Sequence, residues 1–381
     1  MADTVIQANN KLVRYTKEIN REFVRENLFS KYMSQDLNAI IRIDNKLKAG
    51  GEQMNIPLVT KLRGGGVGSG TLVGNEEAID NYGMRIWVDW ARHAVVTKKS
   101  EEQKDSADIF GEAKPLLSDW GKELQRDELI EAFMSLPAET APANLGSNNG
   151  DRVNGIRYEA ASAAQRNTWN AANSDRVLYG SAVGNYNATH ATALATIDPV
   201  ADRLTRGVVG LAKRRMMNAN PAIKPYKTKD GYEWFVAFAG TNSFRDLKAD
   251  LDSVHQNAAP REIKNNPIYQ DGDLVYDGVI IRQVPEISTY VTDVWTSLTT
   301  AGDTASRVEP VFFCGQQAAV LGWGQMAKPT FRKEDDYGFI KGVGTEMCYG
   351  VSKFFKKHPM SGSDLKQWGI LTSFVSAPLD A

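Results

Sequence analysis

The chain has 381 residues, of which 42% are hydrophobic and 24% charged, and its formal net charge is −1. These proportions are typical of a globular protein and exclude a disordered or fibrous chain. The balanced charge predicts no concentrated basic face for nucleic acid, and no apolar run is long enough to span a bilayer. The length predicts two or three domains, or one domain with long excursions.

An amphipathic helix is expected over residues 4–33, followed by a short apolar stretch from Ala39 to Leu47. Apolar residues recur in the helix at three- and four-residue steps, while charged side chains fill its other faces. The apolar positions are Leu12, Tyr15, Ile19 and Phe23. The pattern fits two structures equally, an arm that lies on a neighbouring molecule or a terminal helix on the chain's own core.

Two strands joined by a glycine-rich loop are predicted next, over residues 54–59 and 85–90. Apolar residues alternate with other residues in both segments, as they do in half-exposed strands. The loop glycines are Gly64, Gly65, Gly66, Gly68 and Gly70. An isolated hairpin is at best marginally stable in water. We therefore expect this hairpin to lie on something else, and a second copy of the chain is the natural candidate.

One long helix is predicted from near Ser100 to Phe133, with Ser100 and Gln103 as a capping box. Some 34 residues would form a rod of about 50 Å, and Pro115 should bend or divide it. The apolar stripe expected to support a sheet comprises Ile109, Ala113, Leu116, Trp120, Leu124 and Phe133.

The rest of the chain alternates loops, short helices and strands. Residues 137–155 are rich in Pro, Ala, Asn, Ser and Gly and predict a connecting loop and domain boundary. Helices are expected over 158–173 and from Asp198, with Asp198 as the cap. Beyond Pro221 the pattern predicts strands over 234–238, 274–284, 311–314, 348–355 and 370–375, with short helices over 244–251 and 316–321. This half should be α+β with a mixed or antiparallel sheet.

The glycine-rich loop does not have the sequence of a phosphate-binding loop. Such a loop needs Lys and then Ser or Thr directly after its second glycine, but Thr71 and Leu72 follow Gly70. The three-glycine spacing of a dinucleotide site is also missing. The loop therefore predicts no bound nucleotide.

The histidines and cysteines predict no catalytic or metal site. None of His93, His190, His255 and His358 lies at metal-ligand spacing from a second ligand. Cys314 and Cys348 are expected to be buried free thiols, with a disulfide as the less favoured alternative. Acidic pairs such as Glu76 and Glu77 are more often solvated than catalytic. We expect no cofactor, no metal and no enzymatic activity, although an active site assembled only in the fold stays an alternative.

Three groups of residues, in this order along the chain, carry a family resemblance. They are Gly70 to Glu77 (GTLVGNEE); Val311 to Gly315 (VFFCG) with Ala318 and Trp323; and Asp335 to Gly338 (DDYG) with Gly342, Gly350, Lys353 and Trp368 to Ile370. In these positions the chain resembles the tailed-bacteriophage major capsid proteins of the Hong Kong 97 fold, and more narrowly the capsid family typified by phage N-four. The likeness covers most of the chain and is weakest between Ala138 and Ala195.

The resemblance implies an α+β, Hong Kong 97-like fold in four parts. Residues 1–48 would form an N-terminal arm and residues 49–98 an extended β-hairpin loop reaching over a neighbouring subunit. Residues 99–197 would form a peripheral domain with a long spine helix, and residues 198–381 a mixed α/β axial domain with strands returning to the peripheral domain. The start of the chain lacks the basic and apolar regions of a signal peptide, which predicts assembly in the host cytoplasm.

The resemblance also implies a structural role. Hexamers and pentamers would build an icosahedral shell around viral double-stranded DNA in the virion capsid. The expected partners are the chain itself, portal, scaffolding and decoration proteins, and DNA held by weak non-specific contact, with no membrane. The candidate inter-subunit contacts are Leu12, Tyr15, Ile19, Phe23, Gly64, Gly65, Gly66, Gly68, Gly70, Glu76 and Glu77. The alternative functions are an encapsulin-like nanocompartment shell that holds protein cargo and, less favoured, an enzyme.

Overall fold

The computed structural model describes residues 27–59, 61–62, 64–79, 81–104, 109–148, 150–228, 231–258, 274–332, 336–357 and 365–380. Most of the helix expected over residues 4–33, including Leu12, Tyr15, Ile19 and Phe23, lies outside these residues. Where the described chain begins, the expected helix is replaced by the short 3-10 turn η2 (Ser30–Tyr32). Phe29, just before this turn, is fully buried.

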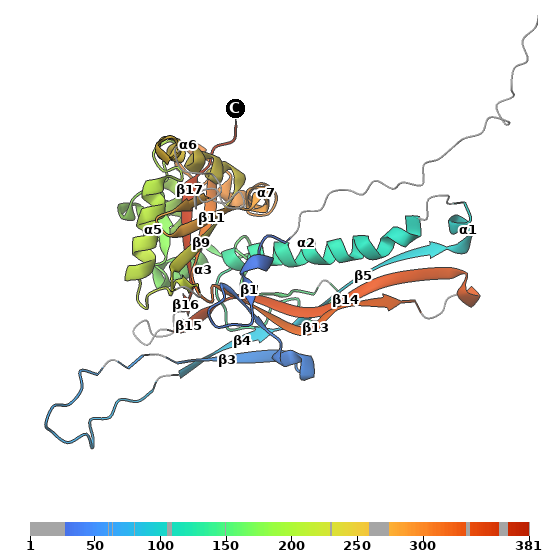
Figure 1. Ribbon diagram of the computed structural model, residues 1–381, viewed down its shortest axis with the longest axis horizontal. Helices are drawn as coiled ribbons and strands as arrows, with labels where there is room; N and C mark the ends of the chain where they lie inside the picture. The colour runs from blue at the N-terminus through green and yellow to red at the C-terminus, as the bar shows by residue number, and fades with distance from the viewer. Residues whose placement is uncertain are drawn as a thin grey trace, which may run out of the picture.

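Within the described residues the chain forms a compact part and an elongated part, each built on its own sheet (Figure 1). The compact part holds a seven-stranded mixed sheet in the order β10-β11-β9-β12-β17-β7, with β8 paired to β9. Its strands are β7 (Val177–Tyr179), β8 (Tyr226–Lys227), β9 (Glu233–Ala239), β10 (Leu274–Tyr276), β11 (Val279–Gln283), β12 (Val308–Cys314) and β17 (Ile370–Ser376). The mixed α+β half expected from the sequence is confirmed.

Helices cover both faces of this sheet. One face, with Phe235 and Phe313, packs against α5 (Arg206–Asn218) and α6 (Thr241–Ala258). The opposite face, with Phe238, Phe312 and Phe374, packs against α3 (Ala163–Ala172), α4 (His190–Ala195), α7 (Pro285–Asp293) and the end of α2 (Ala113–Met134). Successive side chains along a strand point to opposite faces of the sheet, so each central strand contributes side chains to both packed faces.

The elongated part is a six-stranded sheet, counted over the described residues, with α2 lying along it (Figure 1). Its order is β1-β2-β13-β14-β5, with β6 paired to β14. The strands are β1 (Met33–Ser34), β2 (Ile41–Asp44), β5 (Asp89–Lys98), β6 (Val153–Asn154), β13 (Ala319–Phe331) and β14 (Ile340–Lys353). The three longest, β5, β14 and β13, pair antiparallel and set the length of this part.

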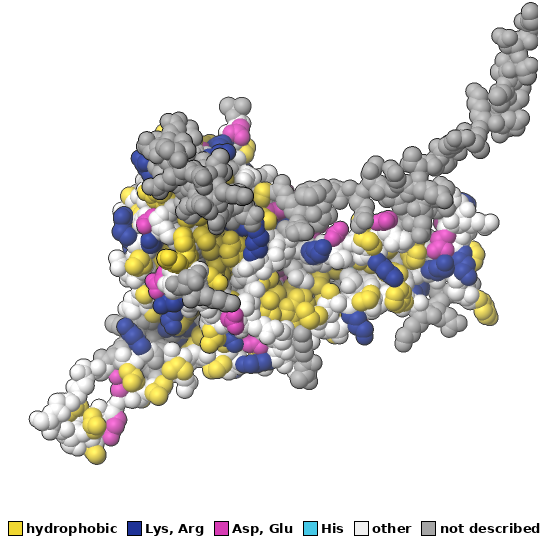
Figure 2. Space-filling model, viewed as in Figure 1, with side chains coloured by type: hydrophobic (Ala, Val, Ile, Leu, Met, Phe, Trp, Pro, Cys, Tyr) yellow, Lys and Arg dark blue, Asp and Glu magenta, His cyan; other side chains and the backbone are white. Residues whose placement is uncertain are grey.

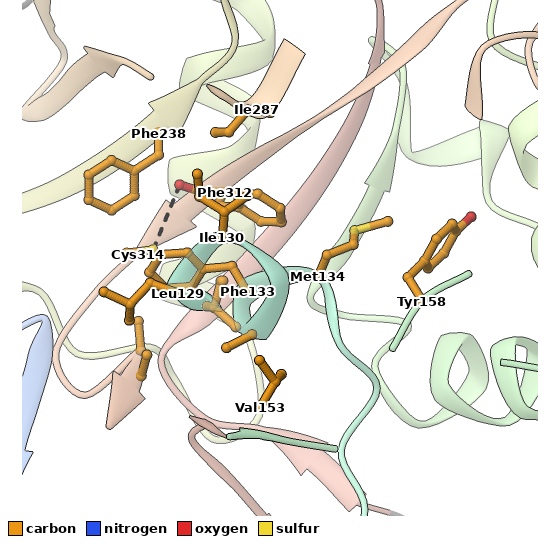
Figure 3. Close-up of a cluster of buried hydrophobic side chains, with 14 of the residues drawn as sticks. Leu129, Ile130, Phe133, Met134, Val153, Tyr158, Phe238, Ile287, Phe312 and Cys314 are labelled. Atoms are coloured by element: carbon orange, nitrogen blue, oxygen red, sulfur yellow. Dashed lines mark hydrogen bonds between the residues drawn. The ribbon is translucent and has the colours of Figure 1, made fainter. Parts of the chain in front are cut away.

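The C-terminal end of α2 joins the two parts. Its side chains Leu129, Ile130, Phe133 and Met134 are at most 1% exposed, and Figure 3 shows them gathered beside Phe312. The Phe133 ring stacks 5.8 Å from Phe238 and 5.6 Å from Phe312, measured between ring centroids. In the same cluster the Cys314 thiol donates to the Phe312 carbonyl oxygen at 3.7 Å.

The hairpin of β3 (Gln53–Val59) and β4 (Asn81–Trp87) packs on its own chain. Met54, Ile56 and Leu58 are buried, which confirms the expected alternation. They pack with Leu47 of the turn η3 (Lys46–Ala49), and with Val320, Phe354 and Phe355. The expectation that these strands need a second copy of the chain to bury their apolar face is therefore wrong.

The long helix differs from its expected bounds. Residues 99–102 form a separate short helix, α1 (Lys99–Glu102), and a 3-10 turn, η4 (Ile109–Glu112), precedes α2. Pro115 lies in the first turn of α2, directly after η4, where the N–H groups of a helix have no partner within it, so Pro115 removes no hydrogen bond from α2. The buried stripe includes Leu117, whereas Leu116 is 46% exposed.

Two other helices were placed wrongly by the sequence pattern. Asp198 Oδ1 accepts hydrogen bonds from the N–H groups of Val200 and Ala201, but these close a turn. Helix α5 begins later, at Arg206, with Thr205 as its cap. Residues 316–321 form the turn before β13 and its first residues instead of a helix. By contrast, the helix expected over 158–173 is present as α3, with a capping box at Ser162.

The remaining elements are short. The hairpin of β15 (Phe355–Lys357) and β16 (Leu365–Gln367) packs beside β4 and α3. The other 3-10 turns are η5 (Val183–Asn185), η8 (Thr296–Leu298), η9 (Asp303–Ala305) and η10 (Asp336–Gly338).

Replacing Phe133 tests the joint between the two parts. Phe133→Ala should lower the free energy of unfolding by about 3–5 kcal/mol, because it leaves a cavity where helix and sheet meet. Denaturant unfolding of the full chain measures this loss. Leu116→Ala, at an exposed position of the same helix, should change stability by less than about 0.5 kcal/mol. Equal losses in the two variants would contradict the role given to Phe133.

Candidate assembly surfaces

The loop between β3 and β4, residues 61–79, exposes large apolar side chains. Leu62, Leu72, Val73 and Ile79 are 61–79% exposed, and Figure 2 shows hydrophobic side chains over this projecting end of the molecule. Exposed apolar clusters of this kind mark contact sites for other molecules. We call residues 61–79 the hairpin loop.

One hydrogen bond within the hairpin loop joins its two sides, and a second orders a local turn. Glu77 Oε2 accepts from the Gly64 N–H at 2.6 Å, and Glu76 Oε2 accepts from the Gly74 N–H at 2.7 Å. Gly74 has a φ of +83°, in the region that favours glycine. The two carboxylates expected from the sequence to contact a neighbour therefore bond to their own loop. These hydrogen bonds order the loop before it docks, which lowers the entropic cost of docking.

All seven contact candidates of the hairpin loop are exposed and lie together. They are Gly64, Gly65, Gly66, Gly68, Gly70, Glu76 and Glu77. The structure does not show what they contact, so their role between subunits stays a prediction. The apolar side chains that flank them were not among the sequence candidates.

The ends of β3 and β4 that carry the hairpin loop are fixed to the body by polar contacts. The Tyr82 hydroxyl donates to Glu139 Oε1 at 2.5 Å, and Lys357 Nζ lies 2.8 Å from Glu139 Oε2. Burial raises the pKa of Tyr82, and its hydrogen bond to Glu139 raises it further. These contacts set the direction in which the hairpin projects.

A second exposed apolar surface lies around the β13–β14 turn, at the end of the elongated part away from the hairpin loop (Figure 1). Its members, which we call the far-end surface, are Val96, Phe331, Tyr337 and Phe339, which are 41–100% exposed. Tyr337 is fully exposed and has a φ of +51°, which is uncommon for a non-glycine residue. Sequence reasoning missed this surface. The aromatic residues on both sides of Gly338 were the available signal.

The residues that most resemble an active site line a cavity of about 320 Å³ beside α3 and α4. Tyr158, Arg166, Asn167 and His190 line it. The Tyr179 hydroxyl donates to Asn170 Oδ1 at 3.0 Å and lies 2.6 Å from His190 Nδ1. That hydroxyl must therefore accept from His190 Nδ1–H.

His190 is held neutral with both ring nitrogens engaged. With Nδ1 donating, its Nε2 accepts from the Tyr158 hydroxyl at 2.9 Å. Burial lowers the pKa of His190 to about 3, and the nearby Arg166 charge acts in the same direction. A histidine with no free nitrogen is not placed to move protons for a substrate, so we interpret this cluster as structural.

The described residues offer little other chemistry. No three His, Cys, Asp or Glu residues among them are grouped to hold a metal ion. Cys314 and Cys348 are buried and free, as the sequence predicted. No helix in the described parts of the chain is long and apolar enough to cross a membrane.

Comparison with known proteins identifies the family. Residues 6–372 match the family described as phage capsid protein. The chain is 33% identical to a chain of the cyanophage Pam1 capsid asymmetric unit, with a TM-score of 0.85 and 100% of both chains covered. It is 17% identical to a chain of the capsid of Ralstonia phage GP4, with a TM-score of 0.71 and the same coverage.

A more distant likeness extends to the head structure of Helicobacter pylori bacteriophage KHP40, at 13% identity and a TM-score of 0.63, with 97% and 96% of the two chains covered. No curated protein matches the chain.

The family match and the likeness to a capsid chain along its whole length support a structural role in a capsid. The chain belongs to the phage capsid protein family. The tailed-phage capsid resemblance stated from the sequence is thereby confirmed, as is its mixed helix and sheet fold. Its location is accordingly the virion capsid.

The His190 cluster predicts how stability depends on pH. Because the folded pKa of His190 is about 3 and the unfolded one about 6.5, the unfolded state binds more protons between these values. Stability should therefore fall as pH drops below 6.5, by about 1.4 kcal/mol per pH unit. His190→Gln keeps a donor and an acceptor but cannot titrate, so its unfolding free energy should lack this slope. Denaturant unfolding between pH 7 and 5 measures it, with the exposed His93→Gln as control. A wild-type slope in His190→Gln would refute the assignment.

Proposed function

We propose that this chain is a major capsid protein that assembles as hexamers and pentamers into an icosahedral shell enclosing the double-stranded DNA of a bacteriophage. The family match and the similarity to a capsid asymmetric unit support this function. The observation that carries the proposal is the hairpin loop, which exposes Leu62, Leu72, Val73 and Ile79 away from the body of the chain.

Identical subunits of this shape can pack side by side into a ring. Its two exposed apolar surfaces, the hairpin loop and the far-end surface, differ from each other and lie at opposite ends. A surface that binds a different surface on the next copy makes head-to-tail contacts, which close into rings. Lasting assemblies of this kind bury at least about 2,000 Å² per interface.

The proposed parts of the subunit follow the order of the chain. Residues 1–48 form the N-terminal arm and residues 49–98 the extended hairpin that reaches a neighbour. Residues 99–197 form the peripheral domain, with α2 as its spine helix, and also supply β7 to the seven-stranded sheet. Residues 198–381 form the axial domain around the seven-stranded sheet and return the strands β13 and β14 to the peripheral domain.

The proposed partners are further copies of the chain, with portal, scaffolding and decoration proteins and packaged DNA. A net charge of −1 suits a wall that confines DNA without binding it tightly. Tight binding would release counterions and make the contact steeply salt-dependent. We propose assembly in the host cytoplasm, and a protein without enzymatic activity.

Electron cryo-microscopy of particles formed by the full chain tests this function. The expected result is a closed shell with subunits around five-fold and six-fold axes, and phage DNA inside shells from infected cells. A monodisperse monomer at high concentration would contradict the proposal. Shells with protein cargo and no DNA would favour a nanocompartment instead.

Polar substitutions in the hairpin loop separate folding from assembly. The double variant Leu72→Ser and Val73→Ser should keep the wild-type melting temperature of the subunit, because both side chains are exposed. It should form few or no closed shells, because contact residues at the centre of an interface often contribute about 2 kcal/mol or more each. Size-exclusion chromatography and negative-stain microscopy measure assembly.

The matched control for this prediction keeps the loop apolar. Leu72→Met with Val73→Ile should assemble as the wild type does. Normal shells from the serine variant would show that these side chains make no essential contact.

A further inference from the structure

Lys353, the last residue of β14, is a buried lysine at the end of the six-stranded sheet. The residue is 1% exposed, and its strand lies between β13 and β5 in that sheet. In the described part of the chain its amine has no carboxylate partner, and the Cys314 thiol is the one titratable group that acts on it. A buried amine without a counter-ion is costly unless other contacts offset the cost.

The Lys353 amine contacts side chains of two other elements. Its Nζ atom donates a hydrogen bond to Oε1 of Gln367 in β16 at 3.2 Å, and lies 5.6 Å from the centroid of the Trp169 ring in α3. Gln367 is 1% exposed and Trp169 is 4% exposed. The Trp169 ring in turn packs on Phe374 of β17, with 6.5 Å between ring centroids. One side chain of the six-stranded sheet therefore reaches the elements that pack on the seven-stranded sheet.

Gln367 is itself held in place by the compact part. Its backbone N–H donates to Oδ1 of Asn173 at 2.8 Å, and its Nε2 donates to the carbonyl oxygen of Arg176 at 3.3 Å. Asn173 is the C-cap residue of α3, and Arg176 directly precedes β7 of the seven-stranded sheet. Both residues are fully buried. A continuous chain of buried hydrogen bonds thus runs from one sheet to the other.

The buried amine lowers the stability of the subunit. Burial lowers the pKa of Lys353 to about 7, because the site favours the uncharged amine over the cation. The nearby Cys314 supplies no negative charge, since burial raises the pKa of its thiol. An apolar side chain of similar length would avoid this cost. We therefore expect the contact to serve the geometry of the subunit more than its stability.

We propose that Lys353 is a positioning residue for assembly, and that its hydrogen bond to Gln367 fixes the angle between the six-stranded sheet and the compact part. The inference rests on the function proposed above. Apolar contacts such as those around Phe133 are non-directional, whereas a buried hydrogen bond is satisfied only over a narrow range of distances and angles. Subunits that share one angle can repeat the same contacts with each neighbour, as a closed symmetric assembly requires.

The variant Lys353→Met tests the role of the amine, because methionine keeps most of the apolar stem. The full-length variant should fold and melt cooperatively. The fraction of chain in closed shells should fall by about tenfold or more relative to the wild type, measured by size-exclusion chromatography and negative-stain microscopy. Lys122→Met, which replaces an exposed lysine of α2, should assemble as the wild type does.

A double variant separates positioning from stability. Lys353→Met alone leaves Gln367 Oε1 without its donor, which costs stability whatever the contact does in assembly. Combining it with Gln367→Met removes both partners, while the Arg176 carbonyl oxygen still accepts from the Thr372 N–H at 3.0 Å. The melting temperature of the double variant should return to the wild-type value or exceed it, whereas its shell fraction should stay low. If Lys353→Met does not fold, the double variant carries the test.

The outcomes distinguish this inference from the proposed function. A wild-type chain that forms no shells would contradict the proposed function and this inference with it. If the wild type assembles, normal shells from either Lys353 variant would overturn the positioning role alone. A double variant as unstable as Lys353→Met would also overturn it, because the contact would then act through stability.

Discussion

The structure depends on one contact, the burial of the last turns of α2 against the seven-stranded sheet. Phe133 stacks on Phe238 and Phe312 there, while the first half of the helix lies along the six-stranded sheet. One helix thus packs on both sheets, within a single hydrophobic cluster that holds side chains of each. Because interiors are packed as densely as organic crystals, the two sheets hold a defined position relative to each other without a sheet that is continuous between them.

The subunit combines buried and exposed apolar surface. The compact part and the hairpin strands satisfy their own hydrophobic faces, as Met54, Ile56 and Leu58 show. Exposed apolar side chains remain at the hairpin loop and at the far-end surface. A shell subunit needs this division, since it must fold before it meets its neighbours and still offer them surface to bury.

Local patterns in the sequence predicted local structure well. The alternation around Ile56 placed the strand β3 and its buried side, and the strands β9, β12 and β17 were found from their apolar runs. The pattern could not say what Ile56 packs against, because Phe354 and Phe355 lie some three hundred residues away. The helix predicted from Asp198 was wrong, because the Asp198 side chain makes the same hydrogen bonds in a turn as in a helix cap.

The candidate surfaces were predicted only in part. The glycines located the hairpin loop, since runs of glycine mark exposed turns, but the carboxylates Glu76 and Glu77 bond within the loop. The far-end surface was missed because Phe331 and Phe339 have the composition of a core. Only the paired ends of β13 and β14 bring these rings to the end of the sheet, where Lys114 Nζ in the first turn of α2 lies 5.3 Å from the centroid of the Phe331 ring.

Because α2 is held at Phe133, a rotation at this joint displaces the other end of the helix and the sheet beside it. The helix has 22 residues, so it spans about 33 Å at 1.5 Å per residue. A rotation of about 10° at its buried end would move its other end by about 6 Å, given that length. A small rotation among the rings around Phe133 would thus become a larger displacement at the first turn of α2, where Lys114 Nζ lies 5.3 Å from the centroid of the Phe331 ring of the far-end surface.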